Sequence, residues 1–349
     1  MKPYSDYLLQ KYPERAKLYE EHGGIWWSTE IKRWMVSHPL LLAEVMESED
    51  FAVPSYDVGA IRDRLNIDLA HLDKLRAHFP LAAEGEAHVA LRQKMAREIA
   101  ANTAGALERF ERKFAQALSG VQACASGSRF CLVRELFQPA LKDANLRLAG
   151  INDDVAEDIE AIPQLFDDTI SLKARINIDA IVGRIAAGLP ADMGPDERYF
   201  RTAIVALNAN TLLGSILQSF VATVSAHPGM PLAAMPWAAE LPATGLPLIE
   251  KKAVRDTTLG GHAIKKGDRL RLFVEAGGYR HGQGPSYSDL YFAVGPHQCP
   301  GKSFSRQIWK LAAKHLSGVD RKIALTHMEY RSRDHVFNLY QRLEAEFDA

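Results

Sequence analysis

The segment from Arg198 to Ala226 constrains the fold more than any other part of the sequence. It has the length and residue types of a helix, it is apolar on nearly every side, and His227-Pro228-Gly229 ends it. Such a helix is stable only where protein covers all of its faces. Because no run reaches the ~18–20 apolar residues that span a bilayer, we expect this helix in the middle of a large globular fold.

Most of the other segments before residue 230 also favour helix. Pro39 suits the start of a helix, and Leu91, Met95 and Ile99 recur near helical spacing. The expected helical segments are the later part of Ile31–Glu49, Glu84–Leu118, Leu132–Leu148 with a kink at Pro139, the acidic stretch Asp153–Ala174, and Gly301–His315. Residues 230–247 favour loop, residues 252–270 favour a β-hairpin, and short strands follow residue 315. The sequence therefore predicts a mainly α fold with a small β portion, as a single domain over residues 1–349.

Composition narrows the class of partner and the compartment. Lys and Arg number 42 against 43 Asp and Glu, so the net charge is −1. Nucleic acids and anionic membrane surfaces select proteins with a basic excess, so we expect neither as the main partner. Three cysteines cannot form a disulfide framework, and the first residues contain no apolar core of signal-peptide length. We expect a cytoplasmic protein without a membrane anchor.

The stretch Phe292-Ala-Val-Gly-Pro-His-Gln-Cys-Pro-Gly-Lys-Ser-Phe carries the strongest chemical signal. Gly295 and Gly301 allow tight turns and close approach to a flat group. Pro300 suits the first position of a helix, which puts Cys299 beside a helix N-terminus that favours a thiolate. A thiolate is a good soft ligand for iron. The alternative is that Cys299 is a buried structural thiol. Cys124 and Cys131 are expected to be ordinary free thiols.

This stretch resembles the haem-binding loop of cytochrome P450 proteins, whose pattern is Phe-Gly-x-Gly-x-His/Arg-x-Cys-x-Gly. The matching residues are Phe292, Gly295, His297, Cys299 and Gly301, and Ala293 replaces the first Gly. The resemblance implies a P450 fold that binds haem b, with Cys299 as the iron ligand and the matching loop residues around the cofactor.

Two further stretches resemble the same family. Glu84-Gly-Glu-Ala-His-Val-Ala-Leu-Arg is similar to a helix whose His and Arg bind a haem propionate, which implies that role for His88 and Arg92. The two lie at i and i+4, on one helical face; a solvated pair is the alternative. The hairpin beginning at Asp256 matches the family closely, and five residues earlier Lys251 replaces the Arg that binds the other propionate. Lys252 beside it leaves the assignment open.

The resemblance fails at three places. The central helix has no Asp or Glu where the family carries an acid–Thr pair that relays protons, so Thr211 with Asn208 or Asn210 beside it is the candidate relay. These residues can equally pair with backbone or a neighbouring helix. The Glu-x-x-Arg motif is incomplete, because Ala243 stands at the Arg position after Glu240. The coil that precedes the Cys loop is short.

These features predict a haem-thiolate oxidoreductase, a P450 monooxygenase that oxidises a small organic substrate. Alternatives are a haem-thiolate enzyme with other chemistry (peroxide-driven oxidation, isomerase or dehydratase) and a non-catalytic haem-binding protein. The resemblance also implies a ferredoxin-type electron donor at a basic helix face, where a solvated face is the alternative. That face carries Lys302, Arg306, Lys310 and Lys314.

Overall fold

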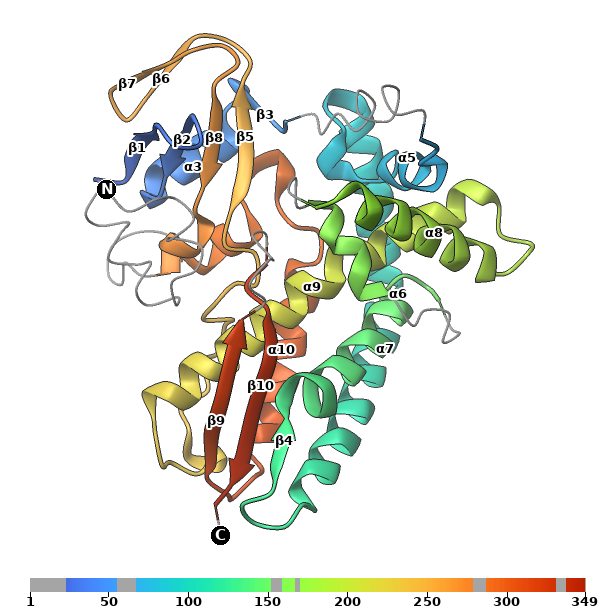
Figure 1. Ribbon diagram of the computed structural model, residues 1–349, viewed down its shortest axis with the longest axis vertical. Helices are drawn as coiled ribbons and strands as arrows, with labels where there is room; N and C mark the ends of the chain where they lie inside the picture. The colour runs from blue at the N-terminus through green and yellow to red at the C-terminus, as the bar shows by residue number, and fades with distance from the viewer. Residues whose placement is uncertain are drawn as a thin grey trace. The chain divides into compact units, whose positions relative to one another are not determined.

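The computed structural model describes residues 23–54, 67–151, 159–166, 170–278, 287–330 and 337–348. The chain divides into two compact units, each built from two separate stretches of sequence. Unit 1 comprises residues 1–57 and 246–299, and unit 2 comprises residues 58–245 and 300–349. Helices dominate and the sheets are small, so the predicted mainly α fold is confirmed (Figure 1).

Unit 1 is organised around a five-stranded sheet in the order β1-β2-β8-β5-β3. β2 and β8 pair in parallel and the other neighbours are antiparallel. β6 and β7 form the two-stranded hairpin predicted from the turn at Gly260-Gly261. The strands are β1 (Ile25–Ser28), β2 (Arg33–Val36), β3 (Phe51–Ala52), β5 (Ile249–Ala253), β6 (Thr257–Leu259), β7 (His262–Ile264) and β8 (Arg269–Leu272).

Helix α3 (Pro39–Glu47) begins at the predicted proline and covers this sheet with its apolar face. Leu42 and Val45 of α3 pack with Val36 of β2 and Leu270 of β8 in one core, and all four are fully buried. Short 3₁₀ turns at Val274–Gly278, Tyr287–Phe292 and Gly295–His297 complete the described part of unit 1. Strands β1 and β2, which precede α3, were not predicted from the sequence.

Unit 2 is a helical body with a three-stranded sheet in the order β4-β10-β9. β9 and β10 run side by side, with β4 on the outer side of β10 (Figure 1). The strands are β4 (Arg129–Cys131), β9 (Ile323–Tyr330) and β10 (Tyr340–Phe347). The helices are α5 (Ala70–Arg76), α6 (Gly85–Gln122), α7 (Gln138–Leu148), α8 (Leu172–Gly188), α9 (Pro195–Ala226) and α10 (Lys302–Leu316).

Helix α9 is the predicted central helix and starts three residues earlier than expected. By length and composition it could cross a membrane, contrary to our expectation that no segment could, but 78% of its apolar window is buried inside the protein. Phe200 and Phe220 of α9 are fully buried. The burial agrees with the expected core helix.

The remaining predicted segments are confirmed with different bounds. A π-helical turn at Leu132–Phe137 precedes α7, and Pro139 lies in the first turn of α7 rather than at a kink inside one continuous helix. The acidic stretch Asp153–Ala174 was predicted as one amphipathic segment; its described part is a 3₁₀ turn at Ile159–Phe166 followed by the start of α8. Most of α8 was not predicted. Residues 230–247 are mostly loop, with one short 3₁₀ turn at Leu232–Ala234.

Candidate functional site

The loop that carries Cys299 is closed by its own backbone. The Cys299 N–H donates to the Phe292 carbonyl at 2.6 Å, and the Gln298 N–H donates to the Gly295 carbonyl at 3.1 Å. Cys299 is half-buried, and it forms no disulfide bond with either of the other two cysteines. The loop thus holds the thiol on a closed turn rather than in the core, which removes one objection to its being a metal ligand.

Two residues of the loop adopt the left-handed backbone conformation. Gly295 has φ of 72°, and a Cβ there would lie 3.0 Å from the Met46 carbonyl oxygen of α3. Ala293 has φ of 56° at the position where the family pattern has its first Gly. Ala293 adopts this conformation at the cost that a side chain imposes in the left-handed region.

The helix after the loop begins at Lys302, with Gly301 as its N-cap residue. We expected Pro300 at the first helical position, and it lies two residues earlier in the chain. Gly301 is buried and has ordinary dihedral angles (φ −86°). Cys299 lies three residues before the start of α10, close to the helix N-terminus as the sequence indicated.

The expected anion-binding residues differ in burial. His88 lies near the start of α6 and is 4% exposed, and Arg92 one turn later is half-buried. On β5 the alternation of the strand buries Lys251, which is 4% exposed, and turns Lys252 to solvent. Of the two lysines, Lys251 lies inside the protein and Lys252 lies at its surface. A buried lysine is retained where an anion compensates its charge.

A neighbouring ion-pair cluster of β5 was not predicted. Glu250 is paired with Arg271 of β8 (Arg271 Nε to Glu250 Oε1, 2.9 Å) and with Arg33 of β2. The carboxylate side chain is only 7% exposed. The cluster ties three strands together across the sheet of unit 1. No local sequence signal identifies it, because the three residues come from distant parts of the chain.

The candidate relay residues on α9 fall into two groups. The Asn208 amide donates to the Asn145 side chain of α7 at 3.0 Å, and the Thr211 hydroxyl donates to the Leu207 carbonyl at 3.3 Å. Both contacts match the alternative that these side chains serve local structure. Asn210 is 1% exposed, and neither atom of its amide finds a hydrogen-bond partner in the described part of the chain.

A small pocket lies between α7 and α9, beside the Asn208–Asn145 contact. Its lining comprises Gln138, Leu141, Lys142, Asn145, Ile159, Val205, Ala209 and Leu213. Most of this lining is apolar, and Asn145 is its link to the polar side chains of α9. Asn208 therefore belongs to the packing between these two helices.

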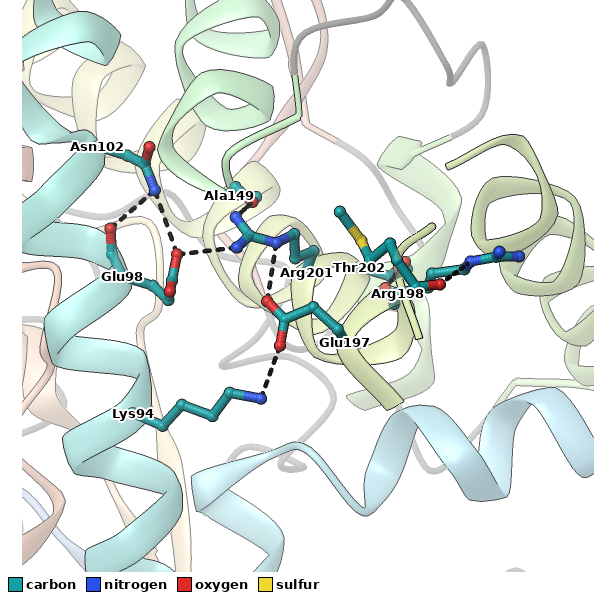
Figure 2. Close-up of polar contacts among 9 residues, drawn as sticks. Lys94, Glu98, Asn102, Ala149, Glu197, Arg198, Arg201 and Thr202 are labelled. Carbon is teal, nitrogen blue, oxygen red and sulfur yellow. Dashed lines mark hydrogen bonds and ion pairs between the residues drawn. The ribbon is translucent and has the colours of Figure 1, made fainter. Parts of the chain in front are cut away.

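The N-terminal half of α9 is fixed by a charged cluster that Figure 2 shows. Arg201 Nη1 donates to the Ala149 carbonyl at 2.7 Å, and its guanidinium lies 3.1 Å from Glu98 and 2.9 Å from Glu197. Lys94 of α6 pairs with the other oxygen of Glu197 at 2.9 Å. The cluster joins α6, α9 and the end of α7, so α9 is held in a fixed position within unit 2.

The basic face of α10 is partly neutralised by acids of unit 2. Arg306 pairs with Glu240, and Lys314 hydrogen bonds to Glu111 at 3.0 Å. The Lys314 hydrogen bond is the main cause that lowers the pKa of Glu111 below its usual value. Lys302 is half-buried and Lys310 is exposed. The predicted docking face therefore contains two cations that already have carboxylate partners.

The donor set suits an iron porphyrin. A single thiol in a closed loop is the protein ligand that thiolate-ligated haem iron takes, and cations such as His88, Arg92 and Lys251 are suitable partners for the two propionates. Cys299 and Lys251 belong to unit 1, and His88 and Arg92 belong to unit 2. Each group of residues fits the cofactor by its own chemistry and burial.

No protein-family model and no curated protein matches the sequence. Solved structures do match. P450BioI, solved with an acyl carrier protein ligated to hexadec-9Z-enoic acid, is 15% identical over 99% of both chains with a TM-score of 0.74. CalO2 is 16% identical over 98% of this chain and 97% of its own, with a TM-score of 0.76. The cytochrome P450 CYP109B1 from Bacillus subtilis is 16% identical over 97% of this chain and 99% of its own, with a TM-score of 0.68. This chain has the fold of the bacterial cytochrome P450 proteins.

Proposed function

We propose that the protein is a haem-thiolate oxidoreductase, a monooxygenase that oxidises a small organic substrate, with Cys299 as the iron ligand. The observation that carries the proposal is the closed loop from Phe292 to Cys299, whose backbone keeps the left-handed turn even where Ala293 replaces a glycine. A loop without a function would have no reason to retain this strained turn beside a half-buried thiol. The P450 fold supports the same conclusion.

Haem b, when bound, supplies an iron that accepts electrons and activates dioxygen. The chain contributes the thiolate of Cys299 and the loop residues Phe292, Gly295, His297 and Gly301 that surround it. Arg92 offers a carboxylate a bidentate fork, whereas Lys251 offers a point charge. The buried positions of His88 and Lys251 support their role as propionate partners, because water competes little for them there. In this proposal the two units form one haem domain.

The α9 residues contribute to proton handling in different ways. The Asn210 amide has donor and acceptor atoms without partners among the described residues, so it is suited to orient a water molecule. An amide cannot transfer a proton as a carboxylate does. Thr211 is the hydroxyl group adjacent to it, and Asn208 is committed to Asn145. We infer that protons reach the site through water that Asn210 orients, with Thr211 as the second group.

A second candidate function keeps the haem and the thiolate but uses peroxide, or uses the iron as a Lewis acid. It is favoured by the lack of any Asp or Glu between residues 198 and 226. Turnover with a reductase, NAD(P)H and dioxygen should be compared with turnover by peroxide alone. Strict dependence on NAD(P)H and dioxygen excludes the second candidate. Turnover with peroxide, together with no turnover in the presence of the reductase, NAD(P)H and dioxygen, excludes the first.

Electron delivery at the basic face of α10 extends the proposal. An acidic ferredoxin-type donor in a reducing cytoplasm would be attracted by Lys302, Arg306, Lys310 and Lys314. Lys310 is exposed, and it has no ion pair within the described ranges, so it is the best single contact. The variant Lys310→Glu should raise the donor's KM and reduce the salt dependence of electron transfer, without changing the haem spectrum.

The test of the iron ligand is the spectrum of the reduced protein under carbon monoxide. The wild type should absorb at the long wavelength typical of thiolate ligation, and Cys299→Ser should lose this band while haem is still measured. Cys124→Ser is the matched control, since Cys124 is a free thiol elsewhere on the protein. A wild type without the band, or a Cys299→Ser variant that keeps it, refutes the assignment.

A further inference from the structure

Helix α10 contacts residues 235–245 of the loop after α9, which we name the clamp segment. The Trp309 indole N–H donates to the Ala238 carbonyl at 2.8 Å, and the Trp309 ring is fully buried. Trp237 packs edge-on against it at 6.0 Å between ring centroids. One turn earlier, Arg306 Nε lies 2.6 Å from Glu240 Oε2. The contacts from Ala238 and Glu240 reach the first half of α10.

The start of α10 has an unfavourable distribution of charge. Its first residue is Lys302, and its first turn contains no acidic residue. Cations near a helix N-terminus are repelled by the positive end of the helix dipole, and a carboxylate there is stabilising. Glu240 brings a carboxylate from a distant part of the chain to Arg306, the fifth residue of α10. The ion pair therefore joins the clamp segment to the second turn of α10, close to the end of the helix nearest to Cys299.

The ion pair contributes to position more than to stability. The side chains of Arg306 and Glu240 are 25% and 42% exposed, and an isolated pair with this exposure contributes about 0–1 kcal/mol. Arg306 follows Cys299 by seven residues, with only Pro300 and Gly301 between the thiol and the helix. Because the connection is short and begins with a proline, a fixed first turn of α10 restricts the conformations open to Cys299.

We propose that Glu240 and Arg306 are positioning residues for Cys299. Their ion pair holds the first turns of α10 against the clamp segment, and this keeps the thiolate in the geometry that ligates iron rather than letting it protonate and detach. The proposal rests on the proposed haem-thiolate function. It also removes Arg306 from the surface available to an electron donor, since its guanidinium has a structural partner within unit 2.

The test uses the haem-loaded protein with the variants Glu240→Gln, Arg306→Gln, the double variant, and the exchanged pair Glu240→Arg with Arg306→Glu. Each single variant should raise the rate of haem transfer to a haem acceptor protein by up to about 5-fold, and should increase the fraction of the reduced carbon monoxide complex in the short-wavelength, thiol-ligated form. The double variant should be no worse than either single one, and the exchanged pair should recover part of the thiolate-ligated fraction.

Glu111→Gln is the matched control. It removes an acid that pairs with Lys314 at the opposite end of α10, so it should leave the spectrum unchanged. If the wild type shows the thiolate band and the Glu240 and Arg306 variants behave like the control, the positioning role is wrong. If the wild type shows no thiolate band, the proposed function fails. Hydrogen exchange of the haem-free protein then tests separately whether the Glu240–Arg306 ion pair holds the first turns of α10. Faster exchange of the Ser303–Ser305 backbone amides in Glu240→Gln supports this role of the ion pair, and unchanged exchange refutes it.

Discussion

Gly245 lies against the backbone of α9 at the turn that carries the candidate relay residues. A Cβ atom at this position would lie 2.4 Å from the Thr211 carbonyl oxygen and 2.6 Å from the Ser215 nitrogen. Ordinary contacts of a Cβ atom begin at 3.4 Å, and helix backbone cannot yield as a flexible side chain can. We therefore predict that Gly245→Ala displaces the loop at Gly245 from α9 by about 1 Å.

The cost follows from the contacts that the displacement breaks. The Gly245 N–H donates to the Ser215 hydroxyl at 2.8 Å, and the Gly245 carbonyl accepts from the Asn338 N–H at 2.8 Å. Each buried hydrogen bond contributes about 0.5–1.5 kcal/mol, and overpacking of the core costs about 1–3 kcal/mol. The free energy of unfolding should therefore fall by about 2–6 kcal/mol. In a domain of 150–250 residues each kcal/mol lowers the midpoint of thermal unfolding by about 2–4 °C.

Thermal unfolding of the wild type, Gly245→Ala and Gly120→Ala measures this effect. Gly120 lies in α6, and no atom lies within 4 Å of a Cβ built there, so Gly120→Ala should stabilise the protein by up to about 1 kcal/mol through helix propensity. A Gly245→Ala variant that melts within 2 °C of the wild type would refute the argument that the loop at Gly245 is pinned to α9. Gly214→Ala should behave like Gly245→Ala, because its Cβ would lie 2.8 Å from the Gly245 Cα.

Three further changes test other parts of the structure. Ala293→Gly relieves the left-handed φ of 56° and should raise the free energy of unfolding by up to about 1 kcal/mol, measured by urea denaturation; a loss would show that the Ala293 methyl group contributes more by packing. Arg201→Gln removes the cation between Glu98 and Glu197 and should cost about 1–3 kcal/mol in the same assay, whereas a change below about 0.5 kcal/mol would make the cluster energetically neutral. Burial lowers the pKa of His78 in the folded protein, so the unfolded chain binds more protons near the ordinary pKa of about 6.5. The free energy of unfolding should accordingly fall as the pH drops from 7.5 to 5.5, and His78→Gln should reduce this difference; an equal difference in both proteins would exclude His78 as a cause.

The sequence predicted the parts of the fold that depend on local patterns. Apolar residues on all sides identified α9, a proline marked the start of α3, and the turn glycines identified the β6–β7 hairpin. Strands β1 and β2 were missed because they are four residues long and their stability depends on β8, more than 200 residues later. A short strand without its partner has no pattern that separates it from a loop.

The candidate site was predictable only in its local part. The spacing around Cys299 identified the loop, and the structure confirmed its closed turn. Pattern alone could not choose between Lys251 and Lys252, because the choice depends on which face of β5 is covered by the core. The Glu240–Arg306 pair had no local signal either, since its two residues are 66 positions apart in the sequence. The resemblance to the P450 family raised the question of what replaces the incomplete Glu-x-x-Arg motif. Only the three-dimensional structure identifies the Glu240–Arg306 pair as a candidate.

The parallel pairing of β2 with β8 has a consequence for how the protein folds during synthesis. Met35 of β2 pairs with Arg271 of β8. Residues 58–245, which belong to unit 2, lie between the two strands in the sequence. The sheet of unit 1 therefore cannot form until these residues have been synthesised and β8 has left the ribosomal exit tunnel. Contacts of such sequence separation fold slowly, and the waiting β1–β2 hairpin has an unpaired edge in the meantime. Synthesis should therefore pass through an intermediate in which the helices from α5 to α9 are formed while β1 and β2 await their partner, and this intermediate is the species most prone to aggregate.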